Sequence, residues 1–293
     1  MRVRSDLFAV ALLAGVTTAC WPLGRSPLQA DTDDTAVDTS DTSDTFDTGE
    51  TGSVASNVPV ARCEAAVTEV TVGEFTEVHV EGADSYDPLG HAIETFTWTL
   101  TPPPDSRGLI QPEGPSARRL QTDVVGAYVV TLVITTDDGR QSEPCEATVD
   151  ALPPPDGLVV ELSWAISADD LDLHLVAPGG YVTGQLDCYY GNMTPDWGAP
   201  GGQDDPVLVA QDTADKGPEV IAYAAPLSGS YTVVVSDYPG HVVDTPNEAT
   251  VTIILGGSTQ TFTRTVTTEG EAYAIATIAW PSGDIVVCPS TGC

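Results

Sequence analysis

The chain has 293 residues, of which 43 are Asp or Glu and 10 are Lys or Arg, so its formal net charge at pH 7 is -33. A surface this acidic repels phosphate groups, which excludes nucleic acid as a partner and makes anionic lipid headgroups poor ones. The 23 prolines and 27 glycines, together with short runs rich in Val and Thr, indicate strands joined by turns. The composition therefore predicts an all-β protein.

The first twenty residues have the organisation of a secretory signal. Two arginines precede an apolar run from Leu7 to Val16, and small residues then lead to Cys20. A bacterial lipoprotein accepts a diacylglyceryl group on a cysteine in this position, which becomes the new N-terminus. We therefore expect residues 1–19 to be a lipoprotein signal peptide and Cys20 to anchor the chain at the bacterial outer membrane or cell surface. The alternative is an ordinary secreted protein cleaved near Ala19.

Residues 20–57 contain almost nothing that a folded core could bury. A loose Asp-Thr repeat, DTDDTAVDTSDTSDTFDTGETG, occupies most of this stretch. Like charges at this spacing repel one another, and the absence of aliphatic clusters leaves nothing to offset the entropy of ordering. We expect a disordered acidic linker between the lipid and the folded part.

Residues 58–152 carry the first set of predicted strands. Alternating apolar residues predict strands at Val67–Val72 and Phe75–Val80, and further strands follow at Thr95–Leu100 and Gly126–Thr135. A run of three prolines ends the series. The pattern predicts a small antiparallel sandwich.

Two of these segments resemble a known family. GADSYDPLGHAIETFTW (Gly82–Trp98) and GAYVVTLVITTDDG (Gly126–Gly139) are similar to two motifs of polycystic-kidney-disease (PKD) domains, in the same order. The resemblance implies an immunoglobulin-like fold and a spacer or adhesive role. The chain departs from it at Thr99–Ser106, where a proline-stiffened loop replaces the acidic turn of many PKD domains. Cys63 and Cys145 fall in the first and last strands, which can run side by side in such a fold, so we expect a disulfide.

Residues 157–293 form the second predicted sandwich, which opens with an apolar strand at Leu158–Trp164. In the segment that follows, a period of two places three leucines on one face and Asp170, Asp172 and His174 on the other. Two interpretations stay open from this pattern. The polar ridge is either a solvated sheet face or part of a cation site.

Acidic residues in the segment after this ridge favour a calcium site. Calcium takes six to eight oxygen ligands from flexible acidic loops, and this segment is rich in them without being low in complexity. The candidate ligands that join Asp170 and Asp172 are Asp187, Asp204, Asp205, Asp212, Asp215 and Glu219.

The same region resembles a bacterial family of extracytoplasmic YfaP-like β-sandwich domains. The resemblance rests on DLDLH, an Asp-Pro-x-Leu turn, x-Gly-Pro-Glu and a Gly-x-Tyr-x-Val-x-Val strand at Gly229–Val235, and it covers most of Gly157–Leu255. It implies a second, jelly-roll-like sandwich and no catalytic mechanism. The family often has two adjacent acids where this chain has Gln211-Asp212.

Catalytic motifs are absent from the sequence: there is no Gly-x-Ser-x-Gly elbow, no His-Glu-x-x-His helix and no phosphate-binding glycine loop. The best candidate general base is His174 beside Asp172. A candidate surface for a glycan or an extracellular protein is formed by Tyr181, Tyr189, Tyr190 and Trp197, together with His174. We therefore expect a binding protein and not an enzyme.

Five cysteines remain after Cys20, which leaves one without an intramolecular partner. We expect Cys188 to pair with Cys288 or Cys293, and the alternative is a short terminal loop closed by Cys288 and Cys293. Strands at Ala249–Leu255, Thr259–Val266 and Ala272–Trp280 complete the second sandwich.

The sequence thus predicts an acidic linker followed by two antiparallel β-sandwich domains. The expected function is non-catalytic binding or adhesion at the cell envelope, with calcium stabilising the second domain. The alternatives are a secreted hydrolase or hydrolase accessory that uses the Asp170, Asp172 and His174 ridge, and a purely structural envelope spacer.

Overall fold

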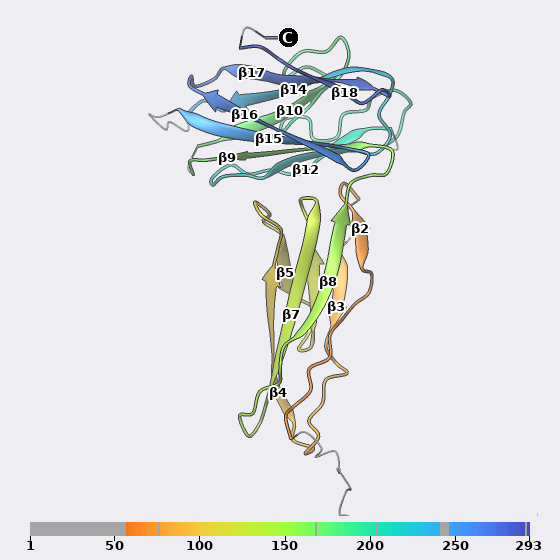
Figure 1. Cartoon of the computed structure of the whole chain (residues 1–293), viewed down its shortest axis with the longest axis vertical. Coiled ribbons are helices and arrows are strands. Elements are labelled where there is room, and N and C mark those ends of the chain that lie inside the picture. The colour runs from red at the N-terminus through yellow and green to blue at the C-terminus, as the bar shows by residue number, and fades with distance from the viewer. Residues whose placement is uncertain (1–56, 75–76, 168, 203, 241–245, 291) are drawn as a thin grey trace, which may run out of the picture. The chain divides into compact units, whose positions relative to one another are not determined.

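The computed structural model describes residues 57–293 except 75–76, 168, 203, 241–245 and 291. All of its regular elements are β-strands, as Figure 1 shows, which confirms the all-β prediction. Nowhere in this described part is there a helix long and apolar enough to cross a membrane. The predicted signal peptide, Cys20 and almost all of the acidic linker lie outside the described residues.

Strands β1–β8 form the first sandwich, which consists of two four-stranded sheets. One sheet has the order β1 (Glu64–Ala65), β3 (Val78–Glu81), β6 (Ala117–Gln121), β5 (Leu109–Pro112). The other has the order β2 (Glu69–Thr71), β8 (Cys145–Leu152), β7 (Gly126–Thr136), β4 (Ile93–Thr101). Neighbouring strands are antiparallel except β2 and β8, which are parallel.

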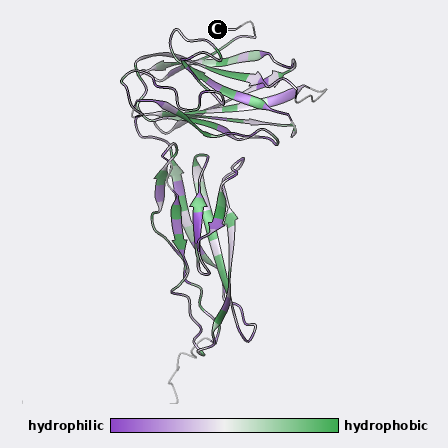
Figure 2. Ribbon diagram, turned by 180° about the vertical axis from the view of Figure 1, so that it is seen from behind, coloured by the Kyte–Doolittle hydropathy of each residue, from purple (hydrophilic) through white to green (hydrophobic). Residues whose placement is uncertain are grey.

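The core of the first sandwich follows the alternation in the sequence. Tyr128, Val130, Leu132 and Ile134 of β7 are fully buried, while the residues between them are partly exposed. Figure 2 shows apolar and polar bands following one another along these strands. A period of two is what a sheet with one buried face requires.

A disulfide joins Cys63 to Cys145, with 5.9 Å between their Cα atoms, as predicted. The hydroxyl of Tyr128 organises the opposite part of the core. It donates to Asp123 Oδ1 at 2.6 Å and accepts the amides of Asp123 and Val124 at 3.0 Å. The hydroxyl of Tyr128 is therefore paired with groups of the chain itself.

Strands β9–β18 form the second sandwich, which consists of two five-stranded sheets. One has the order β12 (Pro206–Ala210), β13 (Glu219–Tyr223), β9 (Leu158–Trp164), β15 (Asn247–Leu255), β16 (Ser258–Val266). The other has the order β11 (Asp187–Cys188), β10 (Leu171–Val176), β14 (Gly229–Asp237), β17 (Ala272–Trp280), β18 (Asp284–Val287). Leucines, valines and aromatic rings fill the space between these sheets.

Strand β10 is buried on both faces, so the interpretation of its polar side as a solvated sheet face is wrong. All six of its residues are buried, and Asp170, which precedes it, is only 5% exposed. Tyr189 covers part of the polar side, because its ring stacks on that of His174 with 5.1 Å between the ring centroids. The segment that contains Tyr189 therefore covers this polar side of β10, and the alternation of residues within β10 could not predict that.

The predicted pairing of Cys188 is also wrong. Cys288 is bonded to Cys293, and Cys188 is a buried free thiol. Cys188 lies on β11 beside Leu175 of β10, where it is part of the apolar core. Burial and the charge of Asp187 raise the pKa of this thiol, so it is an inert core residue.

Candidate cation site

Four acidic residues lie at or near the ends of three strands of the second sandwich. We call Asp170, Asp172, Glu219 and Asp237 the buried acid group; Asp237 is half-buried and the other three are buried. Asp172 lies on β10, Asp170 precedes it, and Asp237 ends the neighbouring strand β14. The register pairs Leu171 with Asp237 and Asp172 with Ser236, so Asp172 and Asp237 lie on adjacent strands and project from opposite faces of the sheet. Glu219 comes from β13 of the opposite sheet.

Glu219 is fully buried and reaches the free edge of β10. Its Oε2 accepts the amide of Leu173 at 2.6 Å, which is available because β11 pairs only with Leu175 and Val176. Its Oε1 is buried and has no hydrogen-bond partner among the described atoms. Burial raises the pKa of Glu219 well above its ordinary value; the Leu173 amide opposes this, and the charges of Asp172 and Asp170 reinforce it.

The pKa values of two further members are raised for the same physical reason. Burial raises the pKa of Asp172 to about 7, and the charges of Asp170 and Asp237 add to this against a hydrogen bond from Ser236. Burial also raises the pKa of Asp237 to about 6, with contributions from Asp169, Glu269 and Asp170. Burial and mutual repulsion both oppose the charged forms.

No described ion pair joins Asp172, Glu219 or Asp237 to a basic side chain. The described arginines bind elsewhere: for example, Arg140 binds Asp87 and Arg119 binds Glu113. A buried carboxylate without a counter-charge costs several kcal/mol, which either a proton or a bound cation offsets. The group therefore has the charge and the oxygen donors of a cation site.

Asp169 and Asn247 hold the segment that enters β10. The Asn247 amide nitrogen donates to Asp169 Oδ2 at 2.7 Å, and its oxygen accepts the amides of Ala165 and Ile166. Asp169, Asp237 and Asn247 were not predicted to contribute to this site. Two of these residues had a signal in the sequence. Asp169 directly precedes Asp170, and Asp237 is an acidic residue at the end of a predicted strand.

His174 is enclosed and hydrogen-bonded through both ring nitrogens. Its Nδ1 lies 2.7 Å from Asp187 Oδ2 and its Nε2 lies 2.9 Å from Ser236 Oγ. The residue is 1% exposed, and Tyr189 stacks on its ring. A general base must reach a substrate proton, and this imidazole is closed to solvent.

The other predicted metal ligands are not brought to the buried acid group, because backbone amides and an arginine hold them elsewhere. Asp187 accepts the amide of Thr183 in addition to its contact with His174. Asp205 and Asp204 accept the amides of Trp197 and Ala199, and Asp212 and Asp215 bind the guanidinium of Arg107 at 2.9 Å. Of the eight predicted ligands, Asp170, Asp172 and Glu219 belong to this group, because the charges of Asp170 and Asp172 act on Glu219.

The predicted aromatic binding surface is also corrected. Trp197 is 3% exposed and packs in the core against Tyr223 and Tyr231, so it cannot stack on a ligand. Tyr190 is half-buried and contacts Tyr238 edge to face at 5.6 Å. Burial raises its pKa, and the charge of Asp172 contributes, which places Tyr190 beside the buried acid group.

Among the predicted aromatic residues, the exposed ring is that of Tyr181, which is 72% exposed. Its ring packs over Gly184, where an added Cβ would lie 3.1 Å from the ring. Gly184 lines a shallow cavity of about 400 Å³, together with Thr183, Gln185, Asn192, Thr194, Pro195 and Asp196. Hydroxyl and amide groups therefore lie next to an exposed aromatic face.

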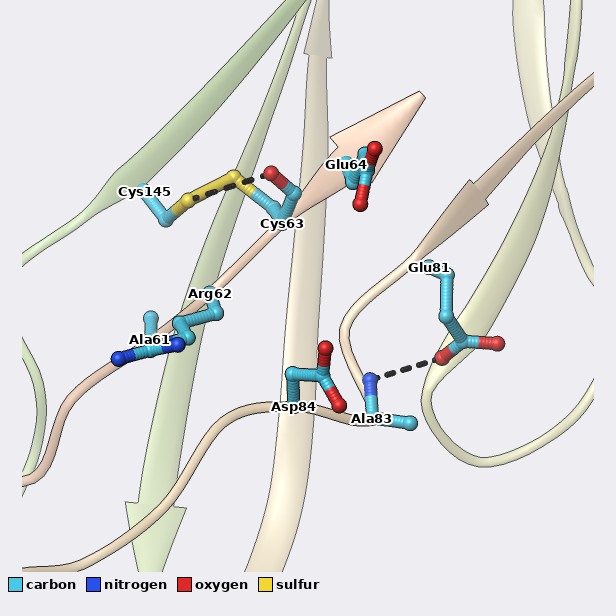
Figure 3. A pocket seen from close by; sticks show the side chains of 8 residues that line it. All are labelled: Ala61, Arg62, Cys63, Glu64, Glu81, Ala83, Asp84 and Cys145. Carbon is cyan, nitrogen blue, oxygen red and sulfur yellow. Dashed lines mark hydrogen bonds between the residues drawn. A yellow bond between two sulfur atoms is a disulfide. The ribbon is translucent and has the colours of Figure 1, made fainter. Parts of the chain in front are cut away.

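Two further features of the first sandwich carry no site. In the described part of the chain, His91, Asp137 and Asp138 are the one set of three with ligand atoms within 4.8 Å of one another. All three are exposed, and both ring nitrogens of His91 already face a carboxylate. Figure 3 shows a cavity beside the Cys63–Cys145 disulfide, where Glu81 accepts the amide of Ala83.

No family model matches the chain, and no curated protein matches it. Among solved structures it is similar to that of the adhesin InvE of Yersinia pseudotuberculosis. The identity is 12%, the TM-score is 0.27, and the match covers 80% of this chain and 69% of that chain. A similarity at this level supports no inference about function.

Proposed function

We propose that the chain is a lipid-anchored, non-catalytic binding or adhesion protein of the bacterial cell envelope, with a second sandwich that calcium stabilises. The observation that carries the non-catalytic part is the enclosure of His174. The hydrolase alternative needs this imidazole at a surface that a substrate can reach. In the described structure the two ring nitrogens of His174 form hydrogen bonds with Asp187 and Ser236.

The loop cavity beside Tyr181 supports a binding role. Exposed aromatic rings next to hydroxyl and amide groups suit sugar rings, because the ring face packs on C–H groups while polar neighbours bind hydroxyls. Thr183 stands in the left-handed region at φ 64°, and its amide is held by Asp187 at 2.7 Å. A non-glycine residue kept in this conformation is typical of loops with a fixed shape.

The anchor and the family relationships remain part of this proposal. The lipid attachment rests on the signal-like N-terminus and Cys20. The PKD-like and YfaP-like resemblances rest on the motifs named above. An envelope spacer shares all these features except a ligand, so ligand binding separates the two hypotheses.

The test is affinity electrophoresis of the full chain in gels that contain xylan, mixed-linkage β-glucan or dextran. We expect one of these polysaccharides to retard the wild type and Tyr181→Ala to remove the retardation. The matched control is Tyr86→Ala, which removes an exposed tyrosine from the first sandwich. If the wild type releases reducing ends from a polysaccharide and His174→Ala does not, the chain is a hydrolase and the proposal is wrong. If no polysaccharide retards the wild type, the result favours the envelope spacer.

A further inference from the structure

Strand β16 is an edge of the second sandwich that is open to pairing with another strand. It is nine residues long, Ser258–Val266, and lies at the end of its sheet beside β15 (Figure 1). Its register with β15 continues through the whole strand without a shift. An edge strand presents unpaired backbone N–H and C=O groups, which the backbone of a further strand can bind.

The other seven edge strands of the four described sheets are each short or interrupted. β1, β2, β5, β11 and β18 have between two and four residues. β12 begins with Pro206 and has a register shift after Leu208, and β4 carries Glu94 at a register shift. Short length, proline, charge and bulges all hinder pairing at a sheet edge. β16 is long and regular, it contains no proline and no acidic residue, and its one charged side chain is Arg264.

The hairpin turn before β16 determines which of its backbone groups are free. A two-residue turn joins Leu255 to Ser258, with φ of 50° at Gly256 and 83° at Gly257, as in a type I′ turn. The residues beside such a turn form a hydrogen-bonded pair, and bonded and non-bonded pairs then alternate along the ladder. Phe262 therefore bonds to β15, and every second residue directs its amide and carbonyl away from β15. These outward groups belong to Thr259, Thr261, Thr263 and Thr265.

The sequence of β16 is nearly the same when it is followed in either direction from Phe262. A two-fold axis at Phe262 places each residue opposite the residue at the same distance on the other side of Phe262 in an antiparallel second copy. Thr261 then lies opposite Thr263 of the second copy, and both have free amides and carbonyls to exchange. The outer threonines, Thr259 and Thr265, pair in the same way. The free backbone groups of β16 are thus complementary to those of β16 itself.

Charge also favours pairing at this edge. Two copies that each carry a net charge of -33 repel one another, so a stable contact must keep acidic residues apart. β16 contributes no acid, and the two-fold arrangement places Arg264 of each copy opposite Gln260 of the other. The hydroxyls of Thr252 and Thr261 lie 3.3 Å apart, and the threonines of a second copy would extend this row across the contact.

We propose that β16 pairs antiparallel with β16 of a second copy, which joins two five-stranded sheets into one continuous sheet. The occupant of this edge is therefore the chain itself. One strand of each copy gives a small contact, so we expect a weak dimer with a Kd of roughly 10 to 100 µM. This inference goes beyond the proposed function and depends on neither the lipid anchor, nor calcium, nor a polysaccharide.

The first test is sedimentation velocity of the full chain from about 5 to about 500 µM in about 0.5 M NaCl, which screens the repulsion between acidic copies. We expect a monomer–dimer equilibrium that weakens at about 0.05 M NaCl. Thr263→Pro removes an outward amide, which an edge strand tolerates, and should weaken association at least tenfold. Thr263→Ala is the matched control, because it keeps the amide and should dimerise like the wild type. A dimer that Thr263→Pro leaves intact would overturn the proposal. A chain that is monomeric at every concentration would also overturn it and leave this edge to a strand of another protein.

Oxidative crosslinking tests the register in a chain that keeps every backbone amide. The two copies of residue 262 meet on the axis as a non-hydrogen-bonded pair with Cα atoms about 4.5 Å apart, which a disulfide can span. Phe262→Cys should therefore give a covalent dimer in non-reducing gel electrophoresis. Thr259→Cys is the matched control, since its two copies would lie about 20 Å apart along the strands. Equal crosslinking of both variants, or none in Phe262→Cys, would overturn the proposal.

Discussion

The two sandwiches satisfy their buried charges in opposite ways. In the first, the side chain of Asp87 is enclosed and receives two hydrogen bonds from the guanidinium of Arg140, at 2.7 and 3.0 Å. The Arg140 contact lowers the pKa of Asp87, against its burial. A disulfide also spans the 82 positions between Cys63 and Cys145. This sandwich supplies its own counter-charge and crosslink.

The buried acid group of the second sandwich has no such counter-charge, and no long crosslink spans this sandwich. Asp172, Glu219 and Asp237 have raised pKa values and no described basic partner. Its disulfide spans only five positions at the C-terminal end, from Cys288 to Cys293. The second sandwich therefore depends on the medium, which must provide either protons or a cation to these carboxylates.

The largest loss of stability is expected when the disulfide of the first sandwich is removed. Replacing Cys63 and Cys145 by alanine should lower the free energy of unfolding by roughly 3 to 5 kcal/mol, because the unfolded chain regains the entropy of a long closed loop. Guanidinium unfolding of the full chain measures this. Replacement of Cys288 and Cys293 is the matched control and should cost much less. Equal losses from both pairs would contradict the comparison.

The second prediction concerns the pH dependence of the second sandwich in EDTA. Asp172 has a pKa of about 7 in the folded chain and 3.8 when unperturbed. Between these values the folded state holds a proton that the unfolded state has released, so stability falls as pH rises from about 4 to 7. Below about pH 4 both states are protonated and the penalty disappears.

The size of this effect is roughly 3 kcal/mol from Asp172, and it is read as the difference between wild type and Asp172→Asn. Thermal unfolding in EDTA at pH 4 to 7.5 should show the variant becoming relatively more stable as pH rises. Saturating CaCl₂ should reverse the sign at pH 7, because calcium favours the ionised wild type. A pH-independent difference in EDTA would show that Asp172 titrates normally in the fold.

A smaller effect is expected from the buried hydroxyl of the first sandwich. Tyr128→Phe leaves the amides of Asp123 and Val124 and a carboxylate oxygen without this partner. Such losses cost about 1 to 3 kcal/mol, and neither pH nor calcium should alter the cost. Guanidinium unfolding with and without CaCl₂ checks this. A calcium-dependent cost would mean that calcium also stabilises the first sandwich.

The smallest effect on stability is expected at Tyr181. The side chain is 72% exposed, so Tyr181→Ala should change the free energy of unfolding by no more than about 0.5 kcal/mol. Its effect should appear only in polysaccharide binding. A large loss of stability would assign Tyr181 to the fold and remove the support it gives to a binding surface.

Strong local patterns in the sequence predicted much of the fold. The strands at Leu158–Trp164 and Ala272–Trp280 have the predicted bounds, and the buried face of Gly126–Thr136 follows its alternation. β13 was missed, because Glu219 begins it at the end of a polar segment and all five of its residues are buried. The alternation around Asp172 identified one face but could not show that other segments cover it.

The candidate site was predictable only in part, for a related reason. Asp170, Asp172 and Glu219 were identified, but Glu219 joins the other two through a contact between sheets that sequence separation does not reveal. Asp187, Asp204 and Asp212 have the same chemistry, yet local amides, His174 and Arg107 hold them elsewhere. Residue type cannot distinguish a carboxylate bound by the chain from one left for an ion.

The most direct measurement is a crystal structure of the full chain grown with CaCl₂, with anomalous scattering used to identify the ion. We expect one calcium peak in the second sandwich, about 2.3 to 2.6 Å from oxygens of the buried acid group. A peak at His91, Asp137 and Asp138 instead, or an ordered buried acid group without an ion, would contradict it.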